Sequence, residues 1–245
     1  VLPLQRERII KIKKQSKSTF AWSGRLNLAK LSLTISLYLS CLYSFGAINV
    51  LIIWDDSSTN THTQSLKAAL QGAGFNTTFS ETSESGFDGT NPSLLDFDAV
   101  IHLDGTTYSV DMPTNGQTAL VNFVNTQGGL YLHGQWLSFE NSYSSNNRYT
   151  SMEDLILFSG HNYHSSSVTM DVAAGQSNHP ILEGISFPVT ISSWVGNKVG
   201  TLKHPNDSIV LLKDSNGTGN HLVVRPYGNG NIVAFSHAAN YASKT

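Results

Sequence analysis

Apolar runs and segments of helical period alternate through the first half of the chain. The first run, Ile48–Trp54, is almost continuously apolar, which is typical of a strand buried on both faces of a sheet. The segment Gln64–Ala73 instead spaces its apolar residues as a helix does, and Gly74 follows it as a helix-ending residue. The next predicted elements are strands at Asn76–Ser80 and Phe97–Leu103, a helix at Gln117–Asn125 and a strand at Leu130–His133. This order predicts a parallel α/β sheet with right-handed crossovers.

The second half of the chain consists mainly of short strand-like runs, and Asn/Gly turns separate the last three. It predicts a β-rich, hairpin-bearing extension that returns one strand to the main sheet. The chain stops ten residues after the last run, where a helix would normally close the sheet, so we expect a fragment of a longer multidomain chain, truncated at its C-terminus. The runs are Ser165–Val172, Ile209–Lys213, His221–Arg225 and Asn231–Phe235.

The first 46 residues have the pattern of a secretory signal. A basic stretch precedes the apolar run Leu31–Ser40, and small residues precede a predicted cleavage site before Ala47. The apolar run is shorter than the roughly 20 residues that a membrane span needs. We therefore expect residues 1–46 to be a signal peptide or N-terminal anchor and residues 47–245 to be one domain. The mature chain is expected without a membrane span, either secreted, periplasmic or at the cell surface, with lipid attachment at Cys41 as an alternative.

Charge is distributed unevenly between these two parts. The whole chain has a formal net charge of −2, but residues 1–47 hold eight of the 15 basic residues and one of the 17 acids. The remainder therefore has a net charge of −9, which is a poor surface for nucleic acid. The only cysteine, Cys41, lies in the basic part. A body without cysteine excludes a disulfide scaffold, a thiolate zinc site and a cysteine nucleophile.

Ligands of open parallel sheets bind beyond the carboxyl ends of the strands. Applied to the predicted inner strands, this rule selects a set of polar and aromatic side chains on four loops that should meet at one edge. His133, Glu140 and His237 are the candidates for acid–base chemistry. The candidates for ligand binding are Asp55, Asp104, Tyr108, Gln135, Trp136 and Asn240.

Three segments carry a resemblance to a known family. They are INVLIIWDD near the start of the domain, GGLYLHGQWLSFE (Gly128–Glu140) and NIVAFSHAANY (Asn231–Tyr241). Their order and strand-end positions resemble class I glutamine-amidotransferase-like domains, with the trehalose-utilisation (ThuA-like) group and its exported relatives as the nearest branch. The resemblance implies a flavodoxin-like three-layer sandwich with a mostly parallel central sheet, here with the β-rich C-terminal extension.

The chain departs from the amidotransferase pattern at the catalytic positions. Those enzymes have a nucleophilic cysteine on a strand-to-helix turn, where this chain reads Leu132 to Trp136 with no Cys, Ser or Thr. His237 matches the family's histidine, but Ala239 stands where its glutamate should be. We therefore expect no glutamine amidotransferase activity. The ThuA-like group is linked to sugar metabolism, so the resemblance implies recognition of a carbohydrate or another small molecule, or an interaction role in a surface protein.

Several other functions compete for the same loops. An enzyme that processes sugars through His237, with Glu140 or Asp104 as its partner, is the main alternative. The hydroxyl-rich loop Ser57–Thr63 is compatible with a flavin phosphate, and the acidic strand ends have some likeness to a response-regulator receiver. His161 and His164 form an H-x-x-H pair that a metal could use. None of these patterns is specific, so we predict no cofactor and no metal.

Overall fold

The computed structural model describes most of the chain from Ala47 onward. All of the described residues belong to one compact unit, Ala47–Thr245. The predicted signal segment and Cys41 lie outside them. None of the helices in the described part has both the length and the apolar character that a bilayer crossing requires. The described residues are 47–104, 109–134, 136–142, 146–160, 163–164, 167–191, 196–197, 201–215, 217 and 219–237.

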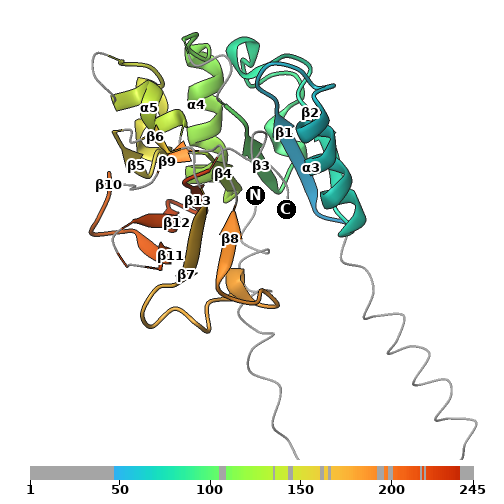
Figure 1. Cartoon of the computed structure of the whole chain (residues 1–245). Coiled ribbons are helices and arrows are strands. Elements are labelled where there is room, and N and C mark those ends of the chain that lie inside the picture. Colours follow the sequence, from blue (N-terminus) through green and yellow to red (C-terminus); the bar gives the residue numbers. More distant parts are fainter. Residues whose placement is uncertain are drawn as a thin grey trace, which may run out of the picture. The chain divides into compact units, whose positions relative to one another are not determined.

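A nine-stranded sheet forms the centre of this unit, in the order β2-β1-β3-β4-β13-β12-β11-β7-β8 (Figure 1). The first five strands in this order are parallel, and the remaining four continue antiparallel. The strands are β1 (Asn49–Ile53), β2 (Asn76–Phe79), β3 (Ala99–His102), β4 (Leu130–His133), β7 (Val168–Val172), β8 (Val189–Ile191), β11 (Ile209–Asp214), β12 (Asn220–Tyr227) and β13 (Gly230–Phe235). Two short pairs lie outside it, β5 (Phe158–Ser159) with β10 (Thr201–Leu202) and β6 (Tyr163–His164) with β9 (Gly196–Asn197).

Local capping explains where the helices begin and end. Helix α3 begins three residues earlier than predicted, because the Asn60 side chain accepts the backbone N–H of His62 at 2.9 Å. Helix α4 continues into a π-helical turn that ends at Gly128, which has a positive φ of 84°. The helical segments are α3 (Thr61–Gly72), α4 (Thr114–Asn122), the π-helix η4 (Phe123–Gln127), α5 (Trp136–Ser142) and the 3₁₀ turns η2 (Glu84–Gly86), η3 (Leu94–Asp96), η5 (Thr150–Leu155) and η6 (Pro180–Leu182).

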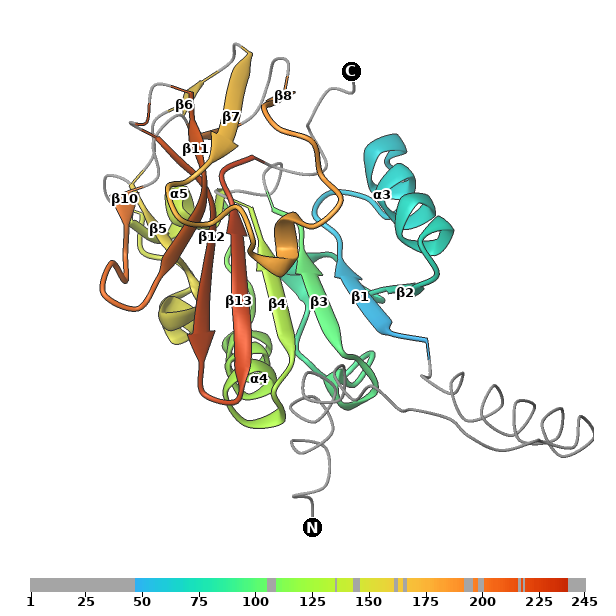
Figure 2. The same cartoon turned by 90° about the horizontal axis from the view of Figure 1, so that it is seen from below.

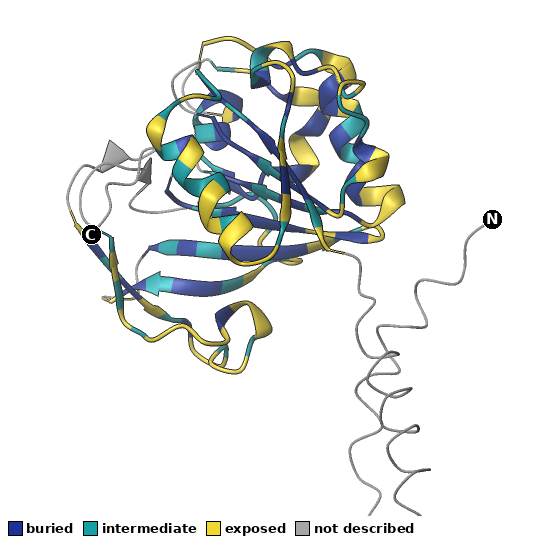
Figure 3. Cartoon of the chain, turned by 90° about the vertical axis from the view of Figure 1, so that its right-hand side faces the viewer, coloured by how far each residue is buried: buried dark blue, intermediate teal, exposed yellow. Residues whose placement is uncertain are grey.

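The two faces of the sheet are covered differently. Successive side chains of a strand point to opposite faces, so Tyr131 packs with the α4 residue Leu120 on one side while Leu132 packs on the other. We call the first side the α4 face. The second side packs against residues 173–188, the turn-rich connection from β7 to β8, which we call the strap, and we call this side the strap face. Figure 2 shows the strap and α3 on one side of the sheet and α4 on the other, and Figure 3 shows the buried strands between them.

The predicted fold class is confirmed. Each predicted strand and helix has a counterpart, and β13 returns to the main sheet parallel to β4, as expected of the C-terminal extension. The elements that the sequence pattern missed are short. Strands β5, β6, β8, β9 and β10 have two or three residues each, which is too few for a period-2 pattern to appear.

Candidate functional site

Four acidic residues gather at the carboxyl edge of the parallel strands, and we call them the acid cluster: Asp55, Glu84, Asp104 and Glu140. Asp55 and Asp104 each lie two residues beyond a strand, β1 and β3, whereas Glu84 begins η2 after β2 and Glu140 belongs to α5 after β4. All four are buried, with at most 2% of any residue exposed. Burial of so much potential negative charge is costly unless the carboxyl groups are paired or protonated.

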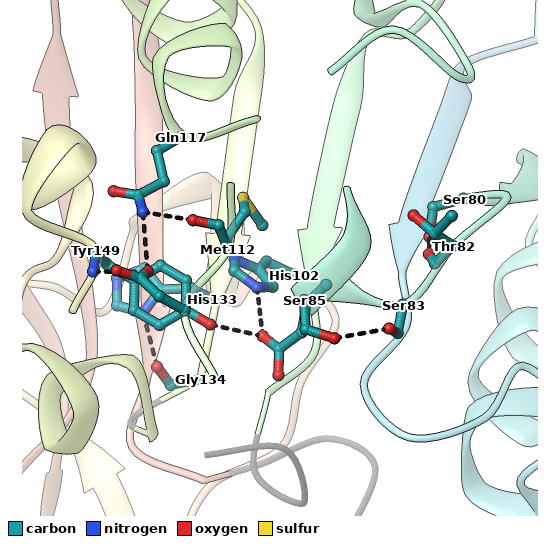
Figure 4. A network of polar contacts seen from close by, with 12 residues as sticks. Ser80, Thr82, Ser83, Ser85, His102, Met112, Gln117, His133, Gly134 and Tyr149 are labelled. Atoms are coloured by element: carbon teal, nitrogen blue, oxygen red, sulfur yellow. Dashed lines mark hydrogen bonds and ion pairs between the residues drawn. The ribbon is translucent and has the colours of Figure 1, made fainter. Parts of the chain in front are cut away.

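Glu84 is the partner of two other buried side chains. Its Oε2 lies 2.8 Å from Nε2 of His102 and accepts the Tyr149 hydroxyl at 3.0 Å. Figure 4 labels His102 and Tyr149 and marks these two contacts with dashed lines. The other ring nitrogen of His102, Nδ1, lies 2.7 Å from the Tyr131 hydroxyl. His102 is thus the interior, fully hydrogen-bonded histidine that its strand position suggests. The network joins β3, β4, η2 and the loop before η5, so it holds the segments beside the acid cluster together.

Tyr149 holds a backbone conformation that the surrounding bonds must enforce. Its φ of 55° is the only positive φ of a non-glycine residue in the described ranges. Such a conformation typically costs about 1–3 kcal/mol and persists where neighbouring contacts determine it. Here the Asp111 carboxylate accepts the Tyr149 backbone N–H at 3.1 Å and Nε2 of Gln117 at 2.8 Å. Gln117 in turn accepts the backbone N–H of Ser151 at 3.0 Å, which ties this loop to α4.

Asp104 and Glu140 differ from Glu84 in having no hydrogen-bond partner for either carboxyl oxygen within the described part of the chain. Burial, with the negative charge of Glu84 as the next cause, raises the pKa of Glu140 to about 9. The nearest described cation, Arg148, is 3.9 Å away and only partly opposes this rise. Burial and the charges of Glu84, Glu140 and Asp55 raise the pKa of Asp104 well above its ordinary value. Glu140 is therefore a carboxylic acid at neutral pH, able to donate a hydrogen bond as well as accept one, and the pKa of Asp104 is shifted in the same direction.

His133 is bound on both of its ring nitrogens. Nδ1 lies 2.7 Å from the Gly134 carbonyl oxygen, and Nε2 accepts the backbone N–H of Leu157 at 3.4 Å. This arrangement fixes the proton on Nδ1, because a carbonyl oxygen can only accept. Desolvation lowers the pKa of His133 to about 4, so the ring is neutral at physiological pH. In this geometry it orders the loops beside the acid cluster.

His237 lies two residues beyond β13, at the carboxyl edge of the sheet and beside the strap face. Val233 pairs with Leu132 in the parallel register, so Val233, Phe235 and, two residues on, His237 follow the strap face. The His237 ring is 5.0 Å from that of Phe235, and its Nδ1 is 2.9 Å from Oγ of Ser236. His237 and His133 line one cavity at the carboxyl edge of the sheet, together with Asp104, whereas Glu140 is not part of that lining.

Three of the six predicted ligand-binding residues belong to the part of the chain that the structure describes. Asp55 and Asp104 lie in the acid cluster, while the Trp136 ring is half-buried and packs edge-to-face on Phe139 at 5.5 Å. The predicted residues Tyr108, Gln135 and Asn240 lie outside the described residues, as does His161 of the H-x-x-H pair. Among the side chains that can be described, no group of three or more histidine, cysteine, aspartate or glutamate residues is arranged to hold a metal ion.

Sequence reasoning missed Glu84, Tyr131 and Tyr149. Glu84 follows the predicted strand Asn76–Ser80, so the strand-end rule would have found it had we applied the rule to that strand as well. Tyr131 lies inside a strand and reads as core. Tyr149 contacts Glu84, which is 65 residues away in the sequence, through tertiary packing. No local sequence pattern predicts that contact.

Comparison with known proteins supports the fold. No protein-family model matches the sequence, and no curated protein matches it either. Among solved structures, the chain is similar to a ThuA-like protein from Bacteroides uniformis, with a TM-score of 0.53 and 13% identity over 80% of this chain and 85% of that one. It is also similar to the protein SMU.1228c, with a TM-score of 0.51 and 11% identity over 80% of this chain and 78% of that one. At these identities the likeness shows the fold, which is the α/β architecture of ThuA-like proteins.

Proposed function

We propose that the acid cluster is a recognition site for a small polar ligand that presents hydroxyl groups, with carbohydrates as the first class to test. One observation carries this proposal: the carboxyl groups of Asp104 and Glu140 are buried at the sheet edge without hydrogen-bond partners among the described residues. An unsatisfied buried polar group typically costs about 1–3 kcal/mol, so two of them beside one another are a feature that ordinary core packing avoids.

The chemistry of protonated carboxyl groups suits hydroxyl ligands. Each acid offers one donor and further acceptor capacity, and a sugar hydroxyl offers the same combination. Because burial raises the pKa of Glu140 to about 9, such a ligand would meet a neutral group there and would not need to carry charge into the site, and the pKa of Asp104 is raised in the same direction. The sequence resemblance to the ThuA-like group, which is linked to sugar metabolism, favours carbohydrate over other polyols.

A general-acid enzyme is the second candidate, and the pKa of Glu140 favours it. An acid that titrates at about 9 retains its proton at neutral pH and can transfer it to a leaving group. In this version Glu140 or Asp104 supplies the proton. His237 lines one cavity with Asp104, so a role for this histidine beside Asp104 is part of the proposal.

A ligand screen by thermal shift tests the recognition proposal, with residues 47–245 as the protein and neutral mono- and disaccharides as probes. A ligand of the site should raise the melting temperature of the wild type, and Asp104→Ala should weaken its binding about tenfold or more, since a buried hydrogen bond to an acid is lost. Asp56→Ala is the matched control, because Asp56 stands beside the same edge but is exposed.

Three outcomes are informative. Equal weakening in both aspartate variants would place binding elsewhere on the rim, and the absence of any shift across the screen would count against a carbohydrate site. Conversion of a bound sugar to product, abolished by Glu140→Gln, would favour the enzyme over the recognition module.

A further inference from the structure

A large apolar cavity lies on the strap face and reaches the carboxyl edge of the sheet, where Asp104 of the acid cluster is part of its lining. Its volume is about 420 Å³, within the range of about 300–1,000 Å³ that is usual for small-molecule sites. The sheet contributes Ile101 from β3, Leu132 from β4, and Val233 and Phe235 from β13. The α3 residue Leu66 also lines the cavity, which therefore lies beside α3 on this face of the sheet.

The strap closes the cavity from the outside. Leu182 from η6 and Phe187 point into it and pack against the same cluster as the sheet residues. Ile181 and Ile185 also line it, yet they are 41% and 50% exposed. Apolar side chains that line a cavity and remain in contact with solvent mark its mouth, so the entrance lies at the strap.

The lining determines the charge that an occupant can carry. Within the described part of the chain, no lysine, arginine or glutamate lines the cavity, and Asp104 is its acidic residue. Asp104, His102 and His133 contribute to its lining, but His102 and His133 bond to groups on the α4 face, and Asp104 has the acid cluster as its electrostatic neighbours. Among the described residues of the lining, His237 is the polar side chain that stands beside Phe235 at the carboxyl end of β13.

We propose that this cavity is a second binding site, which adjoins the acid cluster at Asp104, and that it takes an uncharged, largely hydrocarbon small molecule. A charged ligand would lose its hydration here without meeting an opposite charge, whereas an apolar one exchanges water for Leu, Ile, Val and Phe side chains. An aromatic or branched aliphatic body fits the branched lining, and a single polar group fits the end at His237. The proposal does not depend on the function of the acid cluster.

A fluorescence titration with N-phenyl-1-naphthylamine, an uncharged hydrophobic probe, tests this site on residues 47–245. We expect saturable binding of one probe per chain. Ile185→Glu should weaken it about tenfold or more, because a carboxylate at the mouth must be desolvated when the probe enters. Ile209→Glu is the matched control: Ile209 is 41% exposed on β11, does not line the cavity, and should leave the probe affinity unchanged.

A second variant guards against an indirect effect of charge. Val189→Phe adds volume to the lining from β8 and should reduce probe affinity without placing a charge at the mouth. Absence of saturable binding, or equal weakening by Ile185→Glu and Ile209→Glu, overturns the proposal. A wild-type protein that elutes as a dimer, and that Ile185→Glu converts to a monomer, would show instead that a second copy covers this face, and would also overturn it.

Discussion

Replacement of Glu84 by alanine is expected to lower the free energy of unfolding by about 3–5 kcal/mol, as is typical when one partner of a buried polar pair is removed. The Glu84 carboxylate contacts His102 and Tyr149. Both side chains are buried, so water cannot replace Glu84 as their hydrogen-bond acceptor. Without it, a ring nitrogen and a hydroxyl lose their acceptor. The strained backbone of Tyr149 also loses one of the bonds that hold it.

Chemical denaturation of the wild type and the variant at neutral pH measures this loss. Glu153→Ala is the control, because Glu153 is a half-exposed carboxylate paired with Lys203 at 2.7 Å, and an exposed pair of this kind is worth about 0–1 kcal/mol. If Glu84→Ala lowered the free energy of unfolding no more than Glu153→Ala does, Glu84 would not be the residue that holds His102 and Tyr149 in place.

Stability is expected to fall as pH rises from about 5 to about 9, which is the second large effect. Glu140 has an ordinary pKa of 4.5 in the unfolded chain and a pKa of about 9 in the folded protein. Between these values the folded state keeps a proton that the unfolded state releases. The contribution is complete below pH 4.5 and is lost as pH rises through the folded pKa, at no more than about 1.4 kcal/mol per pH unit for one group. The raised pKa of Asp104 acts in the same direction.

The isosteric variant Glu140→Gln should remove the part of this dependence that comes from Glu140 and leave the part that comes from Asp104. It should be close to the wild type in stability at pH 5 and more stable than the wild type at pH 8. At pH 8 the folded wild type keeps Glu140 protonated, whereas its unfolded chain gains free energy by releasing that proton. Urea denaturation across this pH range is the measurement, with Glu183→Gln as the control at an exposed carboxylate. A wild-type stability that is flat or rises between pH 5 and 8 would contradict the prediction.

These two predictions separate two roles within the cluster. Glu84 is satisfied and stabilises the fold, whereas Glu140 and Asp104 remain unsatisfied and destabilise it at neutral pH. Residues that reduce stability yet lie at the ligand-binding edge of an α/β sheet are candidates for function, because stability and activity commonly conflict at such sites. The acid cluster is therefore the part of this domain where function is expected.

The sequence was sufficient for the fold because the inner strands carry long apolar runs. The run Leu130–His133 coincides with β4, and the alternation of strands and helices leaves few topologies that satisfy short, right-handed connections. The strand-end rule likewise found Asp55, Asp104 and Glu140. These signals are local, since each depends on one element and the residues that follow it.

Contacts between distant segments were beyond the sequence. The face to which His237 belongs follows from the pairing of Val233 with Leu132, and a single sequence does not supply that register. The shape of the strap face depends on turns between β7 and β8 rather than on a periodic element. A residue's type and strand-end position therefore identified candidates, and only the register showed which of them share a face.

The pKa of the Glu140 carboxyl group, measured by a ¹³C NMR titration with Glu140→Gln to assign the signal, tests the central claim most directly. We expect the carboxyl group to stay protonated through neutral pH, so that the chemical shift of its carbon changes only as the group titrates at about 9. A carboxyl group that ionises at its ordinary value near 4.5 would show that Glu140 is paired or hydrated, and would remove the basis for a ligand site at the acid cluster.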